Sequence, residues 1–250
     1  MENPRTIRVV TYNVHKCQGL DRRVRPARIA SVLREMDADV IALQEVVSVE
    51  AGAARESHQA RFIAEELGYQ FHIGENRKHK GGAYGNVVLS RLPVGLCRNY
   101  DITWRGREPR GCLRVDVKSG AAANSPVLHF FNVHLGTAFV ERRHQGRKLV
   151  GEEILRDAGL EGPRVVLGDF NEWTHGLASR LLGEELRSAD VRQHLRSART
   201  YPGAFPLVHL DHVYYDRALE LERLSLHRSL TALVASDHLP LIADFRLPAA

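Results

Sequence analysis

Apolar residues recur along this chain with two different periods, and these periods predict alternating strands and helices. Residues 6–12 alternate polar and apolar side chains and are rich in β-branched types, which is typical of a strand. In residues 26–36 a proline is followed by apolar side chains every three or four positions, which predicts a helix. Residues 38–44 form a further apolar run. A strand–helix–strand unit with parallel strands is therefore expected at the start of the chain.

The rest of the chain repeats these two patterns. Short apolar runs bounded by Gly, Pro or polar residues predict strands, and longer runs with helical spacing predict helices. The expected strands are residues 69–73, 84–91, 94–96, 110–117, 127–136, 163–167, 210–215, 219–227 and 241–247, and the expected helices are residues 56–67, 139–155 and 176–195. Residues 74–82 are expected to form a basic surface loop, residues 99–109 a second loop, and residues 119–125 a hairpin tip.

Composition narrows the class of protein. A chain of 250 residues with 44% hydrophobic and 26% charged residues is typical of a soluble globular protein with a sizeable core. Neither repeats nor a linker interrupt it, so we expect a single domain over residues 1–250 and a monomer. No apolar run is long enough for a transmembrane segment, and the N-terminus lacks the core of a secretory signal, so we expect a cytoplasmic location. Three widely spaced cysteines match no zinc or redox motif and are expected to be reduced.

The formal charge is +5, with 35 Lys and Arg against 30 Asp and Glu. Arginine side chains bind phosphate through a flat two-pronged group, so the excess favours an anionic partner. Nucleic acid, a phospholipid head group and a phosphorylated small molecule all fit this description. An ordinary solvated basic surface explains the same mild excess, and charge alone does not decide between these possibilities.

Polar side chains follow or open several of the predicted strands. The apolar run of residues 163–167 passes into Gly168, which permits a sharp turn, and then into Asp169 and Asn171. Ligands gather at strand ends, and a carboxylate with a carboxamide suits a hard metal ion, an activated water or a phosphate oxygen. Turn chemistry alone also explains Asp and Asn at such a junction. The same placement recurs at Asn13, Glu45, Asn86, His134, Asp211, Asp237 and His238.

These residues share one chemistry. Carboxylates at one rim repel one another, and a divalent cation relieves that repulsion. Oxygen ligands without Cys or clustered His favour Mg²⁺ or Mn²⁺ over zinc. Two histidines with nearby carboxylates suit phosphate stabilisation and proton transfer near neutral pH. Each residue taken singly has an ordinary structural explanation, so the hypothesis depends on the whole set meeting in space.

Seven short motifs containing these residues occur in the order found in the endonuclease/exonuclease/phosphatase superfamily, which has the deoxyribonuclease I-like fold. The chain resembles small bacterial members of this superfamily over residues 6–247. The resemblance implies an α+β fold of two packed mixed β-sheets flanked by helices, a four-layer α/β/β/α sandwich. The motifs are TYNVH (11–15), LQEV (43–46), GNVVLSR (85–91), NVHL (132–135), GDFN (168–171), LDHV (210–213) and SDHLP (236–240).

The resemblance also implies a Mg²⁺- or Mn²⁺-dependent hydrolase of phosphoric esters, acting by in-line attack of water. It implies that Asp169 orients or deprotonates the water and that His238, paired with Asp211, stabilises the transition state. The implied metal ligands are Glu45, Asn13 and Asp237; the implied phosphate contacts are His134 and Asn171; and the expected substrate-binding residues are Asn86, Arg110 and His15. His15 stands where many nucleases of the family have Asp, so the first motif offers the metal one carboxylate fewer.

Several functions remain open at this stage. A phosphodiesterase or nuclease is the first expectation, and the basic residues 77–80 are candidates for contacts with nucleic acid. A phospholipid or sphingomyelin-type substrate would need an apolar rim, for which Trp104 and Trp173 are weak candidates. A non-catalytic binding module on the same fold is disfavoured because every motif acid is present.

Overall fold

A computed structural model describes residues 6–49, 54–79, 81–120, 125–172, 176–189, 200–201 and 208–247. The first of its two sheets has the strand order β11-β12-β1-β2-β4-β3. Its strands are β1 (Thr6–Asn13), β2 (Val40–Ser48), β3 (Gln70–His79), β4 (Gly82–Ser90), β11 (Glu220–Leu226) and β12 (Leu241–Arg246). The helical segments associated with it are η1 (His15–Cys17), α1 (Pro26–Met36), η2 (Arg55–Ser57), α2 (Gln59–Leu67) and α6 (Ala232–Ala235).

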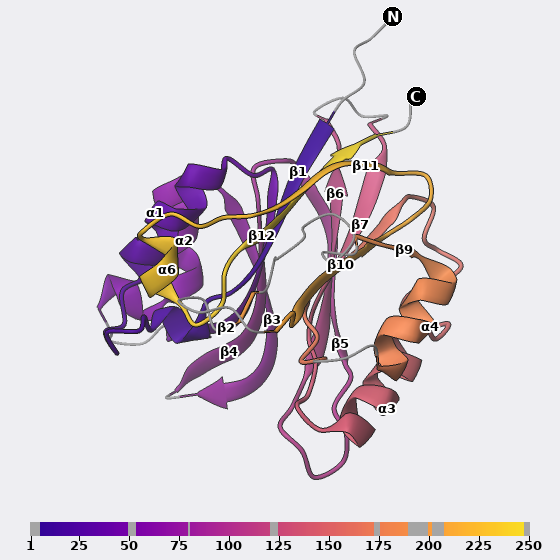
Figure 1. Cartoon of the computed structure of the whole chain (residues 1–250), viewed down its shortest axis with the longest axis horizontal. Coiled ribbons are helices and arrows are strands. Elements are labelled where there is room, and N and C mark those ends of the chain that lie inside the picture. The colour runs from indigo at the N-terminus through magenta and orange to yellow at the C-terminus, as the bar shows by residue number, and fades with distance from the viewer. Residues whose placement is uncertain are drawn as a thin grey trace, which may run out of the picture.

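The second sheet has the strand order β5-β6-β7-β8-β10-β9. Its strands are β5 (Val94–Asp101), β6 (Gly111–Lys118), β7 (Val127–His134), β8 (Arg164–Asp169), β9 (Arg187–Ser188) and β10 (Asp211–Tyr215), and its helices are α3 (Phe139–Leu149) and α4 (Leu177–Glu185). The two sheets stack face to face, with α1, α2 and α6 outside the first and α3 and α4 outside the second (Figure 1). The expected four-layer sandwich is confirmed.

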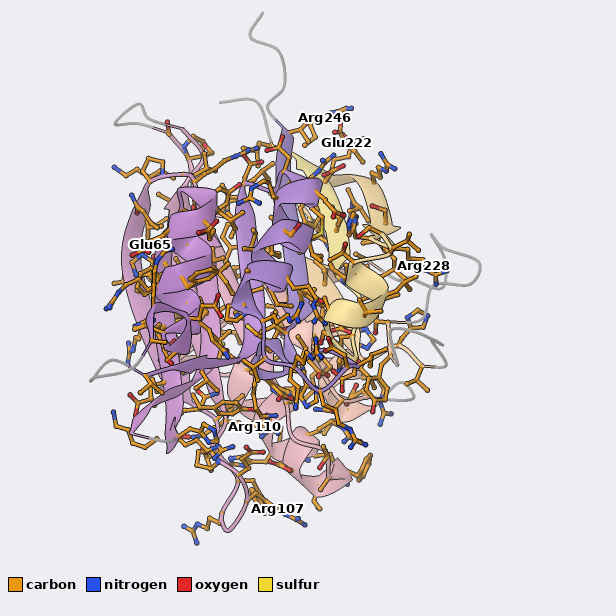
Figure 2. All side chains as sticks on the ribbon, turned by 90° about the vertical axis from the view of Figure 1, so that its left-hand side faces the viewer. Glu65, Arg107, Arg110, Glu222, Arg228 and Arg246 are labelled. Carbon is orange, nitrogen blue, oxygen red and sulfur yellow. The ribbon has the colours of Figure 1, made fainter. Side chains whose placement is uncertain are left out.

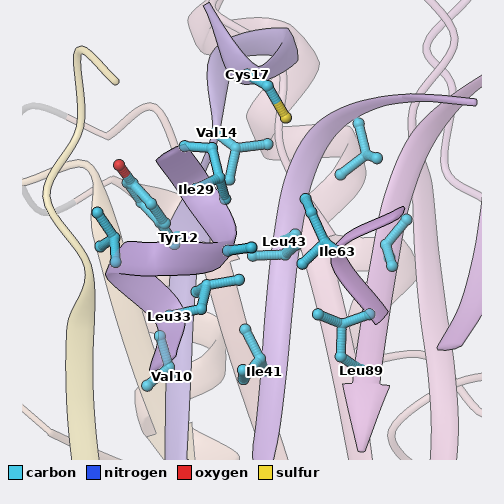
Figure 3. Packing of buried hydrophobic residues seen from close by; sticks show 14 of the residues in the cluster. Val10, Tyr12, Val14, Cys17, Ile29, Leu33, Ile41, Leu43, Ile63 and Leu89 are labelled. Atoms are coloured by element: carbon cyan, nitrogen blue, oxygen red, sulfur yellow. The ribbon is translucent and has the colours of Figure 1, made fainter. Parts of the chain in front are cut away.

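Three apolar layers hold this sandwich together. Between the sheets, alternate residues of facing strands meet, among them Val9, Val88 and Phe130. Outside the first sheet, Ile29 and Leu33 of α1 pack over the neighbouring strands β1 and β2 (Figure 3). A third cluster joins the second sheet to α3 and α4. Each fully buried large apolar side chain contributes about 1.5–3 kcal/mol, so the helical spacing seen in the sequence has a direct energetic cause.

Two parallel strand pairs bring functional residues to one end of the sandwich. The strands β1 and β2 are parallel, as predicted, and Asn13 lies opposite Gln44, next to Glu45. The strands β7 and β8 are also parallel, and His134 lies opposite Asp169. Parallel pairing places Asn13 beside Glu45 and His134 beside Asp169, and all four residues line one cavity although β2 itself continues to Ser48.

Three buried amide side chains connect the sheets across their interface. Gln44 Nε2 of the first sheet donates to Asn132 Oδ1 of the second at 2.8 Å. Asn132 Nδ2 returns two bonds of 2.9 Å, to the carbonyls of Leu43 and Val87. Asn86 Nδ2 donates to the carbonyls of Gly111 and Asn132 at 3.0 and 3.1 Å. Buried amides require such partners, so this network specifies how one sheet sits on the other.

The structure corrects several predicted boundaries. Residues 74–82, predicted as a loop, mostly belong to the β3–β4 hairpin, because β3 is an edge strand with one neighbour and tolerates polar side chains on both faces. Strand β2 continues past Glu45 to Ser48, and β5 extends to Asp101, inside the predicted loop of residues 99–109. Helix α3 ends at Leu149 and α4 at Glu185, earlier than predicted. Residues 121–124 of the predicted hairpin tip and residues 190–195 of the predicted last helix lie outside the described residues.

Candidate active site

A cavity of about 510 Å³ opens at the end of the sandwich where both parallel strand pairs finish. Its walls come from both sheets, so residues far apart in sequence meet there. Of the predicted site residues, those that line it are Asn13, Glu45, Arg110, His134, Asp169, Asn171, Asp237 and His238. The convergence on which the sequence hypothesis depends is therefore present.

Asp169 lines the cavity and is 1% exposed. Its Oδ2 accepts a hydrogen bond of 3.0 Å from Asn13 Nδ2 and lies 3.6 Å from the Nε2 atoms of both His134 and His238. Its Oδ1 accepts from the backbone N–H of Asn171 at 2.9 Å. A carboxylate held by so many donors keeps one orientation, which suits a group that must align a water or a proton.

The two histidines beside Asp169 differ in charge. Burial disfavours a charged imidazole at His238, but Asp211 and Asp169 outweigh it and raise the pKa of His238 to about 10. Its Nδ1 lies 2.9 Å from Oδ2 of the fully buried Asp211, which also orients the ring. At His134 burial prevails and, together with the nearby Arg110, lowers the pKa to about 4. At neutral pH the cavity thus presents one cationic and one neutral imidazole.

Backbone strain is concentrated around this cavity. Of seven non-glycine residues with positive φ in the described part of the chain, Lys16, Glu45 and Asn171 line the cavity, and His15 and Cys17 flank Lys16 in sequence. Such conformations are costly for side chains with a Cβ and persist where the surrounding structure enforces them, most often at functional sites. Their clustering supports the assignment of this cavity as the functional one.

Glu45 owes its position to an irregularity in β2. The register with β4 shifts between Leu43 and Val46, and Glu45 has a φ of +59° within this bulge. A bulge re-aims a side chain without ending the strand. The expectation that Glu45 follows the end of a strand was therefore wrong, although the residue does reach the cavity.

Gly168, before Asp169, has a φ of +147°, and a Cβ there would lie 1.9 Å from the carbonyl oxygen of Val133. Glycine thus permits both the unusual backbone conformation and the close approach of β8 to β7. The sequence argument expected a sharp turn at Gly168, and this was wrong: Gly168 lies inside β8, which continues to Asp169, and the contact with β7 is what requires a glycine there.

Glu45 already has a cationic neighbour. Lys16 Nζ lies 3.0 Å from its Oε2, and Asn13 Nδ2 lies 3.3 Å from its Oε1. Burial opposes ionisation of Glu45, but attraction by His134, which is protonated at the low pH where Glu45 titrates, attraction by Lys16, and the hydrogen bonds from Lys16 and Asn13 outweigh it and hold its pKa at about 2. A permanently ionised carboxylate is thus matched by an ammonium group at the point where a metal ion would neutralise it.

The donor set fits a hard divalent cation as an open site. The described residues contain no group of three or more His, Cys, Asp and Glu that could hold a metal. Glu45 and Asp237 both line the cavity, whereas Asn13 turns its amide N–H groups, not its oxygen, toward Glu45. Mg²⁺ is commonly held by one or two carboxylates, with water and substrate phosphates completing its coordination, and Glu45 and Asp237 are carboxylates of this kind.

Some predicted residues lie outside the cavity lining. Asn86 is fully buried and donates across the sheet interface. Asp211 lies behind His238 and reaches the cavity through it. His15 Nδ1 lies 3.6 Å from Asp237 Oδ1, beside the cavity. Trp104 is 4.7 Å from the ring of His144 and does not line the cavity, and Trp173 and Lys80 lie outside the described residues.

The sequence analysis missed several lining residues. Lys16 follows the first motif directly, so its position gave a usable signal. Arg77 was expected only as part of the basic segment 77–80, a candidate for contacts with nucleic acid, and Glu108 gave no signal, because the two meet only through the pairing of distant segments. The missed residues are Lys16, Tyr84, Glu108, Thr137, Tyr201 and Leu210.

This fold and this arrangement of residues define a member of a family of phosphoric-ester hydrolases. The sequence matches the Endonuclease/Exonuclease/phosphatase family over residues 10–238, and the chain belongs to that family. No helix among the described residues is long and apolar enough to cross a membrane.

The chain is also similar to individual proteins in sequence or in fold. The chain is 31% identical to the uncharacterized protein YbhP of Escherichia coli over 97% of both chains. Its fold is similar to that of an endonuclease/exonuclease/phosphatase from Beutenbergia cavernae, with a TM-score of 0.80, 25% identity, and coverage of 98% of this chain and 72% of that one. It is also similar in fold to a mannosyl-6-phosphatase of Bacteroides thetaiotaomicron, with a TM-score of 0.75, 18% identity, and coverage of 96% and 99%.

Proposed function

We propose that this protein is a Mg²⁺-dependent hydrolase of phosphoric esters and that phosphodiesters are its preferred substrates; Mn²⁺ would serve the same role. The observation that carries the proposal is the surroundings of Asp169. One buried carboxylate oxygen lies 3.6 Å from a cationic and from a neutral imidazole, in a cavity that also contains Glu45. A base, a cationic donor and a metal-binding carboxylate are the groups that in-line phosphoryl transfer to water requires.

Each residue has a distinct part in this proposal. A bound divalent ion, held by Glu45 and Asp237 with Asn13 nearby, would neutralise charge on the phosphoryl and leaving oxygens. Asp169 aligns the attacking water and accepts its proton. His238, held by Asp211, donates a hydrogen bond to a phosphoryl oxygen as negative charge grows there.

The remaining polar residues are assigned to binding. His134 and Asn171 contact phosphoryl oxygens, although Asn171 Nδ2 now donates to the Leu135 carbonyl at 2.9 Å. Arg110 binds the substrate as a cation. Asn86 and His15, which do not line the cavity, would influence substrate only through their neighbours.

The test is hydrolysis of bis(p-nitrophenyl) phosphate by purified protein with Mg²⁺ or Mn²⁺, and its loss in chelator. Asp169→Asn and His238→Gln should each lower the rate by about a hundredfold or more, with unchanged circular dichroism. Asp21→Asn and His227→Gln, changes of the same type at exposed ion pairs, serve as controls and should retain the rate.

Parallel assays extend the test to p-nitrophenyl phosphate, DNA, RNA and phospholipid vesicles. Greater turnover of the monoester would refute the preference for diesters. Absence of turnover on every substrate, with Mg²⁺ binding measured by calorimetry, would refute the catalytic proposal and support a binding module.

A further inference from the structure

A second group of charged side chains lines the same cavity. Arg77 comes from β3, whereas Glu108 and Arg110 come from the segment just before β6. Glu108 Oε1 lies 3.1 Å from Arg77 Nε, and Glu108 Oε2 lies 3.0 Å from Arg110 Nη2. A single carboxylate thus holds two guanidinium groups at one wall of the cavity, one with each of its oxygens.

Arg110 is firmly anchored and almost fully buried. Its side chain is 7% exposed, its backbone N–H donates to Thr103 Oγ1 at 3.0 Å, and its carbonyl accepts from the Ile102 N–H at 3.0 Å. Figure 2 shows it at the same end of the molecule as Arg107, in the loop between β5 and β6. The Nε of Arg110 has no hydrogen-bond partner among the described residues.

The ion pair between Arg110 and Glu108 is expected to contribute little to the stability of the fold. Burying a guanidinium is costly, and Glu108, its ionic partner, has a side chain that is 41% exposed. Ion pairs with such exposed partners contribute little to folding. A guanidinium has five N–H donors, so binding to Glu108 leaves donor capacity for a ligand.

Arg77 stacks on an aromatic ring. Its Cζ lies 4.4 Å from the centroid of the Tyr84 ring, and Tyr84 also lines the cavity. The stacking sets the plane of the guanidinium, and its Nε, like that of Arg110, has no hydrogen-bond partner among the described residues although Glu108 Oε1 is 3.1 Å away. A guanidinium that is already oriented loses less entropy when it binds a phosphate with its two-pronged face.

Charge and space both favour an anion here. Two arginines against Glu108 leave this group of three side chains with a net charge of +1, whereas Lys16, also in the cavity lining, is matched by Glu45. The cavity of about 510 Å³ is far larger than the roughly 30 Å³ that one water molecule occupies in the liquid, so it has room for more than one phosphate group.

We propose that Arg77 and Arg110 form a second anion subsite that binds a phosphate group other than the one attacked. The substrate then carries at least two phosphates, either on one small molecule or as successive phosphates of a nucleic-acid strand. The inference rests on the proposed function only for the place of the attacked phosphate beside Asp169 and His238, and anion binding is measurable without turnover.

The experiment compares two ligands by calorimetry in Mg²⁺ buffer, with Asp169→Asn as the background so that neither ligand is consumed. Thymidine 3′,5′-bisphosphate should bind about tenfold tighter than thymidine 5′-monophosphate, as expected for one added charge-assisted contact. Adding Arg77→Met should reduce this ratio to below about three, because the second phosphate loses one of its two guanidinium groups. Arg77→Lys keeps the positive charge but lacks the two-pronged guanidinium, so it should give an intermediate affinity ratio.

Arg98→Met is the matched control. Arg98 also stacks on a tyrosine, with its Cζ 4.6 Å from the Tyr100 ring centroid, but it does not line the cavity. Its replacement should leave the ratio unchanged. Thermal melting verifies that all variants are folded.

A third ligand, a ten-residue thymidine strand, separates the two sources of the second phosphate. If Arg77→Met weakens binding of the bisphosphate, the subsite accepts a small molecule. If it weakens only the binding of the strand, the subsite binds a neighbouring phosphate of the nucleic-acid backbone. Unchanged binding of both ligands would overturn the subsite. A wild-type protein that hydrolyses no ester yet shows the predicted ratios would refute the proposed function and leave the subsite standing.

Discussion

Replacement of Lys16 by Met should increase the affinity of the protein for Mg²⁺. The ammonium group lies 3.0 Å from Glu45 Oε2, and the two side chains are 34% and 18% exposed. At that distance and an effective dielectric constant of about 20, the direct attraction is roughly 5 kcal/mol. Desolvation and side-chain ordering cancel most of it, and partly exposed pairs retain about 1 kcal/mol. A divalent ion that must displace Lys16 therefore binds about fivefold more weakly than it would without the lysine.

Titration calorimetry at constant ionic strength measures this difference directly. Lys16→Met should lower the dissociation constant for Mg²⁺ about fivefold, whereas Lys78→Met, which removes an exposed ion pair of 2.9 Å with Glu75, should leave it unchanged. Equal or weaker binding by Lys16→Met would show that the lysine does not compete for Glu45. Absence of binding in every protein would refute the metal proposal itself.

Two further predictions concern stability. Gly168→Ala should destabilise the fold by about 3 kcal/mol or more in urea denaturation, because its Cβ would overlap a carbonyl oxygen of β7. The control Gly183→Ala, in an open position of α4, should stabilise the fold by about 0.5–1 kcal/mol. Equal effects of the two substitutions would contradict the close approach of β8 to β7. Burial opposes ionisation of Asp116, but hydrogen bonds from His129 and Arg114 outweigh it and lower its pKa, so its contribution is complete well above the unfolded pKa of about 3.9 and is lost as the pH falls through the lower folded pKa. Asp116→Asn should therefore cost about 2 kcal/mol or more at pH 7, and progressively less as the pH is lowered below about 3.9, in urea denaturation at a series of pH values. A cost independent of pH would disprove the linkage.

The elements that the sequence predicted best are those with local signals. Pro26 at the start and a continuous apolar stripe as far as Met36 define α1 from one segment alone. The prediction of a loop at the β3–β4 hairpin was wrong because the polar residues of this segment belong to an edge strand, whose pattern resembles that of a loop. Local periodicity does not report which strands have two neighbours, and that property decides how polar a strand can be.

The residues of the candidate site also differ in whether the local sequence indicates them. Asp169 and His238 carried the motif chemistry and were identified from sequence. Lys16 lay one residue beyond the first motif and was overlooked, because its ion pair with Glu45 depends on an unusual left-handed backbone at both residues. The pairing of Arg77 and Arg110 through Glu108 depends on the approach of β3 to the loop before β6, which no spacing in the chain encodes.

The amide network between the sheets has a consequence for the order in which activity and secondary structure are lost. Glu45 and His238 belong to the first half of the sandwich, and His134 and Asp169 belong to the second. A shift of one sheet relative to the other would therefore separate these four residues, while each sheet kept its own backbone hydrogen bonds. Turnover should therefore disappear under mild pressure or low urea before far-ultraviolet dichroism changes. Asn132 and its partners therefore act with the apolar core to fix the alignment of the two sheets on which the cavity depends.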